Sequence, residues 1–401
     1  MMEISEAKKQ GIETVKVLIA KGIISRKWGN VSCRVDDNNF VITPIGADCQ
    51  SLKSEDISLI NIEKPNCSKD ILSSLEIGLH TEVYKTYPSV NVVIHTHQEF
   101  ASVIGSCGLS SIKVDDKYKT LAEKVVCASY GLPGTEELSR KTAITLKKTN
   151  GNAIILKNHG ALCFGSGEEI AIKSAIELEE ACKEHLKEEY LKQSGEEVFN
   201  EAAMYSYALS RESKNKAKIP FGSVRRIYDA NRDRRGFTLY DEKSKHVIRN
   251  QITKSTHPEE AMIYRAIFKN IAGVNNIIVN YSKSVIALIH LNKPIRPLLD
   301  DFAKLVGTKV NIEGDNPFEI VGDLKNASVV FLRGIGALCC GRTKEDANAV
   351  SMAVEKNCKA YIGTFLLGKA QPLSSYEAFK MRRIYLKNNL NRLKKVINFK
   401  K

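Results

Sequence analysis

Several features are scarce in this 401-residue sequence, and each scarcity argues against a class of protein. No apolar run approaches the roughly 20 residues that a membrane-spanning helix needs, which argues against a transmembrane protein. The first residues lack the uninterrupted apolar centre and the small-residue cleavage site of a signal peptide. Tryptophan occurs once, and no basic motif is interleaved with aromatic residues, as would be typical of many nucleic-acid binders. We therefore expect neither a membrane nor a nucleic acid among the partners.

Paired cysteines are also missing, although the chain contains 10 cysteines. No CxxC pair occurs, and several cysteines lie inside apolar runs, such as Cys163 in ALCFG. A free cysteine behaves as a small buried hydrophobic residue, and free thiols persist in a reducing compartment. The sequence thus predicts a cytoplasmic protein.

Acidic residues are too few to balance the basic ones, and the formal net charge is +14. The lysines are spread throughout the chain, which is typical of a solvated surface. Only the C-terminal segment is locally basic, because no acidic residue follows Glu377. Four apolar residues in that segment have helical spacing and predict a docked terminal helix: Leu386, Leu390, Leu393 and Ile397.

The length bears on domain organisation, because 401 residues exceed one typical hydrophobic core. The polar, weakly periodic stretch 194–223 is the expected linker, and we predict domains over residues 1–210 and 224–401. In the first half, VSCRV and NFVIT flank a DDNN turn that is typical of a β-hairpin. Buried strand-like runs then alternate with amphipathic helices, which predicts an α/β fold with a central sheet and flanking helices.

The second half repeats motifs of the first. YPSVNVVIHTH is echoed by IAGVNNIIVNY, which aligns Val90 with Val274. NHGALCFG is echoed by GIGALCCG, which aligns His159 with Ile335. We interpret this repetition as a tandem duplication.

The most informative stretch is SSLEIGLHTEVYKTYPSVNVVIHTH, residues 73–97. Glu76 and His80 are four residues apart in a predicted helix, which places them on one face. His95 and His97 end an apolar run that predicts a buried strand, where residues two apart point the same way. Two imidazoles on an apolar strand need a partner, and with a carboxylate they form most of a divalent-cation site.

A third imidazole comes from His159 in the NHG segment, which is expected to be a loop. Together with Glu76, this gives a set of three histidines and a carboxylate that suits a transition metal. The second half cannot build the same site, because the aligned positions are Val279, Tyr281 and Ile335.

With GN and TPIG earlier in the chain, these motifs make residues 5–210 resemble the class II aldolase/adducin family. Its members include fuculose-phosphate aldolase, the rhamnulose-phosphate aldolases and ribulose-phosphate 4-epimerase. The resemblance implies three-layer α/β/α domains with a largely antiparallel central sheet. It also implies a zinc-dependent aldehyde-lyase that acts on a small sugar phosphate or related hydroxy-ketone through a metal-stabilised enediolate. Family members are ring-like tetramers, so a homodimer of this duplicated chain would form a pseudo-tetramer.

The same resemblance assigns the site residues. His95, His97 and His159 match the zinc-binding histidines, and Glu76 matches the residue that ligates zinc at rest and acts as general acid/base. The positions that hold the substrate phosphate are matched by Gly29, Asn30, Thr43, Gly46 and Ser74, with Ser73 as a further hydroxyl beside them. Elementary chemistry agrees, because a cation held by neutral imidazoles polarises a ketone and a nearby carboxylate suits as the base.

Two positions depart from the family's phosphate loops, which typically read TPSG and SSE. The chain has TPIG and SLE, so Ile45 and Leu75 replace two hydroxyl donors. Because a hydrogen bond to a charged group is worth about 1.5–3 kcal/mol, the identity of the substrate stays open. Family aldolases carry Glu where the epimerases carry Asp, so Glu76 favours an aldolase. The proton-donating tyrosine stays open among Tyr118, Tyr205, Tyr207 and Tyr385.

Two alternatives use the same residues. An epimerase, dehydratase or decarboxylase would perform the same metal–enolate chemistry on another substrate. A non-catalytic, adducin-like interaction module would keep the fold, but such modules are expected to lose the ligands that the first half retains.

Overall fold

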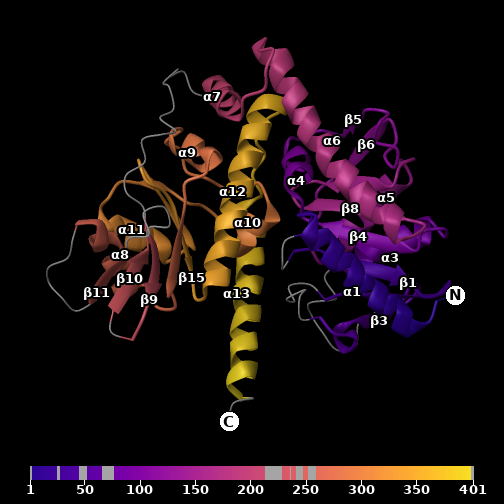
Figure 1. Ribbon diagram of the computed structural model, residues 1–401, viewed down its shortest axis with the longest axis horizontal. Helices are drawn as coiled ribbons and strands as arrows, with labels where there is room; N and C mark the ends of the chain where they lie inside the picture. Colours follow the sequence, from indigo (N-terminus) through magenta and orange to yellow (C-terminus); the bar gives the residue numbers. More distant parts are fainter. Residues whose placement is uncertain are drawn as a thin grey trace. The chain divides into compact units, whose positions relative to one another are not determined.

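The computed structural model describes residues 2–24, 28–44, 52–65, 76–212, 228–234, 236–240, 247–251 and 259–398. The chain divides into two compact units, residues 1–193 with 367–369 and residues 194–366 with 370–401 (Figure 1). The domain limits 1–210 and 224–401 remain predictions. None of the described helices is both long and apolar enough to cross a membrane.

The first unit is built around one sheet. Its strands are β1 (Asn30–Arg34), β2 (Asn39–Ile42), β3 (Ser58–Asn61), β4 (Val92–Thr96), β5 (Ser111–Lys113), β6 (Lys124–Ala128), β7 (Ala153–Leu156) and β8 (Gly160–Gly165). Their spatial order is β3-β2-β1-β4-β8-β7-β6-β5. Neighbouring strands run antiparallel except for the parallel pair β6 and β7, and the predicted hairpin is confirmed as β1 and β2.

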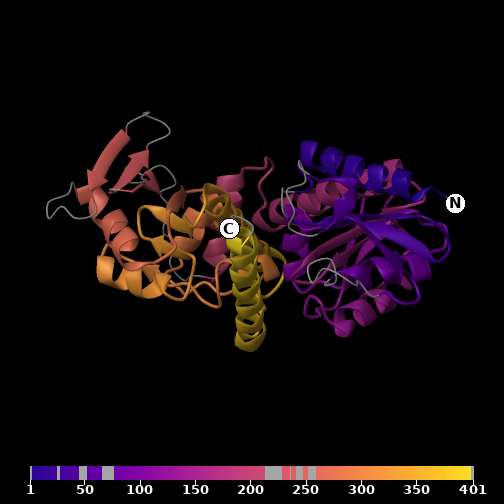
Figure 2. The same ribbon diagram turned by 90° about the horizontal axis from the view of Figure 1, so that it is seen from below.

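Helices cover both faces of this sheet (Figure 2). They are α1 (Ile4–Ala20), α3 (Ile77–Thr86), α4 (Glu99–Ser106), α5 (Glu136–Leu146) and α6 (Glu168–Ser194). Because successive strand residues point to opposite faces, β4 contributes to two cores. Val92 and Ile94 pack with α1, α4 and α6, whereas Val93 packs with α3 and α5. The expected three-layer α/β/α fold with a largely antiparallel sheet is confirmed.

The second unit has a sheet of the same topology. Its strands are β9 (Asp229–Arg232), β10 (Gly236–Tyr240), β11 (Val247–Gln251), β12 (Asn276–Asn280), β13 (Ile312–Glu313), β14 (Val329–Leu332) and β15 (Gly336–Gly341). The order β11-β10-β9-β12-β15-β14-β13 matches the first unit strand for strand, and the parallel pair β13 and β14 takes the place of β6 and β7. Within the described residues, β5 has no counterpart in this sheet. This shared order agrees with a tandem duplication.

The helices of the second unit confirm one expectation and correct another. They are α7 (Glu201–Glu212), α8 (Glu259–Asn270), α9 (Lys283–Ile289), α10 (Asp300–Leu305), α11 (Pro317–Leu324), α12 (Lys344–Leu367) and α13 (Ser375–Asn398). The predicted C-terminal helix is present as α13, and Arg382 ties it to the carbonyl oxygens of Lys304 and Leu305. Of the four apolar residues expected to dock it, Leu386 is exposed, and the side chains of the other three lie outside the described residues. The stretch expected to be a linker contains α7, because its apolar positions, Met204 and Tyr205 among them, become buried.

The turn before β8 shows how closely the two copies match. Asn158 adopts a left-handed backbone conformation with φ of 59°, and the aligned Gly334 has φ of 71°. Asparagine and glycine adopt this conformation at the lowest cost. The strand that follows begins with glycine in both copies, and a Cβ on Gly160 would collide with the carbonyl oxygen of Thr96. Both copies therefore keep the same tight turn beside the same neighbouring strand.

Candidate metal centre

Four of the predicted site residues converge at one end of the first sheet. His95 belongs to β4, His97 follows that strand, and His159 lies in the turn between β7 and β8. Glu76 occupies the N-cap of α3, one residue before the helix rather than inside it as predicted. One ligand atom from each residue lies within 4.8 Å of those of the other three. The structure thus brings the whole predicted set together.

The imidazole nitrogens that meet are all Nε2. Nε2 of His95 lies 3.1 Å from Nε2 of His97 and 3.1 Å from Nε2 of His159. Nδ1 of His95 lies 2.9 Å from the carbonyl oxygen of Ala161, which can only accept a hydrogen bond. Nδ1 therefore carries the proton, and Nε2 of His95 presents a lone pair to the centre.

The Glu76 carboxylate faces these imidazoles. Oε2 lies 3.5 Å from Nε2 of His95, and Oε1 lies 3.7 Å from Nε2 of His159. Burial alone would raise the pKa of Glu76, but the neighbouring imidazoles, His95 first and then His159 and His97, hold it well below its ordinary value. The carboxyl is therefore ionised at neutral pH.

This donor set fits a divalent transition metal. Two atoms that each ligate zinc at about 2.1 Å are at most about 4.2 Å apart, and the four separations above fall inside that limit. Glu76, His95 and His159 expose only 4%, 0% and 1% of their surface, so water cannot readily satisfy them. Buried lone pairs that point at one another are unfavourable unless a shared cation compensates them.

The segment after β4 is fixed to α6 by hydrogen bonds that sequence reasoning missed. The Thr96 hydroxyl donates to Oε1 of Gln98 at 2.6 Å, and Nε2 of Gln98 donates to the carbonyl oxygen of Ala175 at 3.0 Å. Gln98 is buried, so these bonds hold the strand end on which both histidines depend. The available signal was a glutamine directly after the HTH motif.

The residues matched to the phosphate loops are only partly described. Gly46, Ser73 and Ser74 lie outside the described residues, as do Ile45 and Leu75. The three that are described lie close to the metal-centre strand: Gly29, Asn30 and Thr43.

These three residues already have defined contacts within the protein. Gly29 has φ of 112°, and a Cβ there would lie 2.5 Å from the carbonyl oxygen of His95. Nδ2 of Asn30 donates to Oε2 of Glu76 at 3.2 Å. Oγ1 of Thr43 accepts a hydrogen bond from the backbone N–H of Val31 at 3.0 Å.

The four candidate proton donors divide between the units. Tyr118 belongs to the first unit, where its hydroxyl donates to Oε2 of Glu184 at 3.0 Å. The other three belong to the second unit: Tyr205, Tyr207 and Tyr385. The choice of donor therefore stays open.

The aligned positions of the second unit follow the same strand register. Val279 pairs with Leu338 in β12 and β15, as His95 pairs with Leu162 in β4 and β8. The expected replacement of the predicted ligand His95 by an apolar residue therefore occurs at the equivalent place in the second sheet.

His80, which shares the stretch with Glu76, is not one of the four clustered side chains. Its Nε2 lies 2.7 Å from Oδ1 of Asn30, and its Nδ1 lies 2.7 Å from Oγ of Ser32. Burial is the main cause that lowers the pKa of His80 to about 3, and the nearby His95 acts in the same direction. The native imidazole is therefore neutral throughout the physiological range.

This lowered pKa predicts an acid-dependent loss of stability. The unfolded chain binds a proton at His80 near pH 6.5, whereas the native chain does not, so the free energy of unfolding decreases as pH falls below 6.5. The contribution is about 1.4 kcal/mol for each pH unit between the two pKa values. Urea unfolding at pH 7, 6 and 5 should show a shallower pH slope for His80→Gln than for the wild type. Equal slopes would contradict the assignment.

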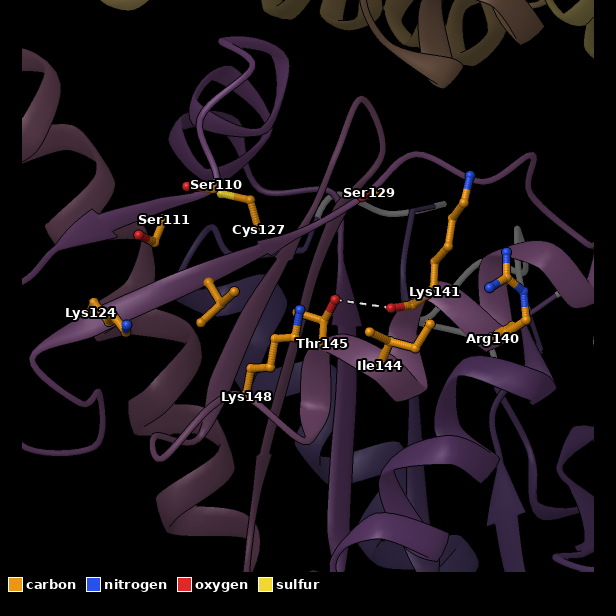
Figure 3. Close-up of a pocket in the computed structure, with 11 residues that line it drawn as sticks. Ser110, Ser111, Lys124, Cys127, Ser129, Arg140, Lys141, Ile144, Thr145 and Lys148 are labelled. Carbon is orange, nitrogen blue, oxygen red and sulfur yellow. Dashed lines mark hydrogen bonds between the residues drawn. The ribbon is translucent and has the colours of Figure 1, made fainter.

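A separate cavity of about 520 Å³ lies between the β5–β6 hairpin and α5 (Figure 3). Its basic side chains are Lys124, Arg140, Lys141 and Lys148. Three of them are solvent-exposed, and Lys141 is held by Oε1 of Glu137 at 2.6 Å. None of the residues described as lining this cavity belongs to the metal group. It is a basic cavity that is separate from the candidate metal centre.

A three-layer α/β/α domain that gathers three histidines and a glutamate at one end of its sheet defines a class of candidate metal-dependent enzymes. A family model described as "Class II Aldolase and Adducin N-terminal domain" matches residues 9–186 and again residues 233–362. The chain belongs to the class II aldolase and adducin family, and the two matched segments agree with the tandem duplication.

Individual relatives are about one quarter identical to this chain over the aligned residues. A 5-deoxy-D-ribulose 1-phosphate aldolase from Bacillus thuringiensis serovar kurstaki is 27% identical over 165 residues, covering 41% of this chain and 76% of that protein. The structure of an L-fuculose 1-phosphate aldolase is 25% identical, covering 53% of this chain and 99% of the other with a TM-score of 0.44. The fuculose-1-phosphate aldolase from Thermus thermophilus is 27% identical, with shares of 46% and 96% and a TM-score of 0.39.

Proposed function

We propose that the chain is a zinc-dependent class II aldolase that cleaves or forms a C–C bond in a small sugar phosphate or related hydroxy-ketone. The observation that carries this proposal is the convergence of Glu76 with three imidazole Nε2 atoms at one end of the first sheet. The relative named as a 5-deoxy-D-ribulose 1-phosphate aldolase supports a phosphorylated sugar as substrate. Glutamate, rather than aspartate, at position 76 favours an aldolase over an epimerase.

Different residues of the first unit would bind the metal and transfer the proton. His95, His97 and His159 would hold the cation, with Glu76 as a fourth ligand at rest. When bound, a divalent cation polarises a ketone oxygen and stabilises the enediolate that forms when a C–C bond breaks or an α-proton leaves. Glu76 would exchange that proton at Oε1, because Oε2 already accepts a hydrogen bond from Asn30. Its lowered pKa keeps it ionised at neutral pH, which is the form that can accept a proton.

Metal analysis coupled to a substrate screen tests this proposal. The purified chain should contain about one divalent transition metal, and it should release an aldehyde from ketose 1-phosphates such as fuculose and rhamnulose 1-phosphate. Removal of the metal by a chelator should abolish this activity, and zinc should restore it. Conversion of pentulose phosphates without C–C cleavage would indicate an epimerase instead. A metal-free chain with no lyase activity would favour a non-catalytic, adducin-like module.

A further inference from the structure

Five buried side chains of the first unit form a continuous series of hydrogen bonds that ends on Glu76. The Tyr84 hydroxyl lies 2.8 Å from Oγ of Ser32, and Oγ of Ser32 lies 2.7 Å from Nδ1 of His80. Nε2 of His80 lies 2.7 Å from Oδ1 of Asn30, and Nδ2 of Asn30 lies 3.2 Å from Oε2 of Glu76. None of the five exposes more than 4% of its surface, so water does not compete for these bonds.

The direction of each bond follows from the carboxylate. Nδ2 of Asn30 donates to Oε2 of Glu76, so the amide turns its carbonyl oxygen toward His80. That oxygen only accepts, so Nε2 of His80 carries a proton. Because burial keeps His80 neutral, its Nδ1 accepts the hydroxyl proton of Ser32. Oγ of Ser32 then accepts from Tyr84, and every group in the series donates toward Glu76.

Comparison with the second unit indicates whether the fold alone requires this series of hydrogen bonds. The strand register aligns Ser32 with Ala230, since each is paired with the corresponding residue of the next strand, Val93 or Ile277. The same register aligns Asn30 with Tyr228, and the sequence offset that aligns Val90 with Val274 aligns His80 with Tyr264 and Tyr84 with Phe268. The four donors are therefore replaced together. None of these replacements can rebuild the series, because the amide, the imidazole and the serine hydroxyl are all lost.

Packing at these positions is nevertheless conserved between the copies. The rings of Phe40 and Tyr84 lie 4.9 Å apart in the first unit, and the rings of Phe237 and Phe268 lie 5.3 Å apart in the second. Both copies therefore keep an aromatic ring at this place, but only the first keeps the hydroxyl. The hydrogen-bonded series is absent from the copy that also lacks the three histidines, which links the series to the metal centre rather than to the fold.

We propose that His80 is a positioning residue for Glu76 and acts through Asn30. His80 fixes the orientation of the Asn30 amide, so that the amino group, and not the carbonyl oxygen, faces the carboxylate. The Asn30 side chain then serves the acid/base residue rather than the substrate phosphate that family resemblance assigns to it. This inference rests on the proposed function insofar as Glu76 is the acid/base residue.

The tautomer of His80 can be read without turnover. In ¹⁵N-histidine NMR spectra of the metal-loaded wild-type chain at neutral pH, we expect His80 to be neutral with its proton on Nε2. The signal is assigned by its loss in His80→Gln. A proton on Nδ1, or an imidazolium, would overturn the proposed direction of the series. This measurement needs no substrate. An inactive protein would therefore count against the aldolase proposal, while the NMR spectrum would still test the direction of the hydrogen bonds.

Kinetics of two His80 variants separate positioning from folding. The amide of glutamine can occupy the place of Nε2 and donate to Asn30, whereas the amide of asparagine is too short to do so. We expect His80→Asn to lower kcat by about 10- to 100-fold with metal content and KM nearly unchanged, and His80→Gln to recover most of that loss. Equal losses in both variants, or a loss that follows metal content, would overturn the proposal.

A third variant tests the role of Asn30 directly. We expect Asn30→Ala to lower kcat by about 10- to 100-fold, while the inhibition constant of inorganic phosphate changes less than about twofold. If Asn30 held the phosphate instead, the inhibition constant would rise about tenfold and kcat would be largely retained. His290→Ala, which removes an exposed histidine of the second unit, is the matched control and should change neither quantity.

Discussion

Replacing His95 by alanine is expected to remove the bound metal and to lower lyase activity by at least about a thousandfold. His95 is fully buried, and its Nε2 lies 3.1 Å from the Nε2 atoms of both other histidines. Its Nδ1 is committed to the carbonyl oxygen of Ala161, so no tautomeric change can compensate. Loss of this ligand leaves two imidazoles and a carboxylate, which bind a cation much more weakly.

Two measurements check this result. Metal content by inductively coupled plasma mass spectrometry should fall well below one ion per chain, and turnover should fall with it. His290→Ala, which alters a histidine remote in sequence from the motifs, should retain both. A His95→Ala protein that keeps its metal and more than a tenth of its activity would refute the assigned centre.

Glu76→Gln should separate metal binding from proton transfer. Glutamine has nearly the same shape and keeps an oxygen that can accept from Asn30, but it cannot take up a proton at neutral pH. We expect kcat to fall by about 10²- to 10⁴-fold, as for other general acid/base residues, while KM changes little. The three imidazoles should still retain the cation, although with lower affinity.

The decisive comparison is between metal content and kcat in the same Glu76→Gln preparation. Metal at or near wild-type content with a low kcat would support an acid/base role. A kcat close to the wild type would show that another group moves the proton. Solvent deuterium exchange into the substrate, followed by NMR, offers an independent measurement of the same step.

Much of the metal centre could be predicted from sequence because its signals are local. His95 and His97 are two residues apart in an apolar strand, and this period alone places both imidazoles on one side. His159 could be assigned only through the resemblance to the family, because no local sequence pattern connects residue 159 with residue 95. The α/β class followed from alternating apolar runs and amphipathic helices in the same local way.

Tertiary pairing explains what the sequence did not reveal. Ser32 and Tyr84 are 52 positions apart, and they meet only because β1 pairs with β4 beside α3. Whether a strand such as β5 extends the sheet depends on how the sheet edge closes, which no short pattern encodes. Likewise, α7 formed in a stretch whose polarity favoured a linker, because packing of a few apolar residues outweighed the average composition.

The replaced series in the second unit also shows how differently the two units fill equivalent positions. Where the first unit buries an asparagine, a serine and a histidine, the second buries Tyr228, Ala230 and Tyr264. Each buried polar group of the first unit is stable only while all of its partners remain in place, so one substitution disturbs the whole series. In the second unit the Tyr264 hydroxyl instead donates to the backbone carbonyl oxygen of Tyr228 at 2.7 Å. The same strand register thus holds a series of interdependent side chains in one unit and a single side-chain-to-backbone hydrogen bond in the other.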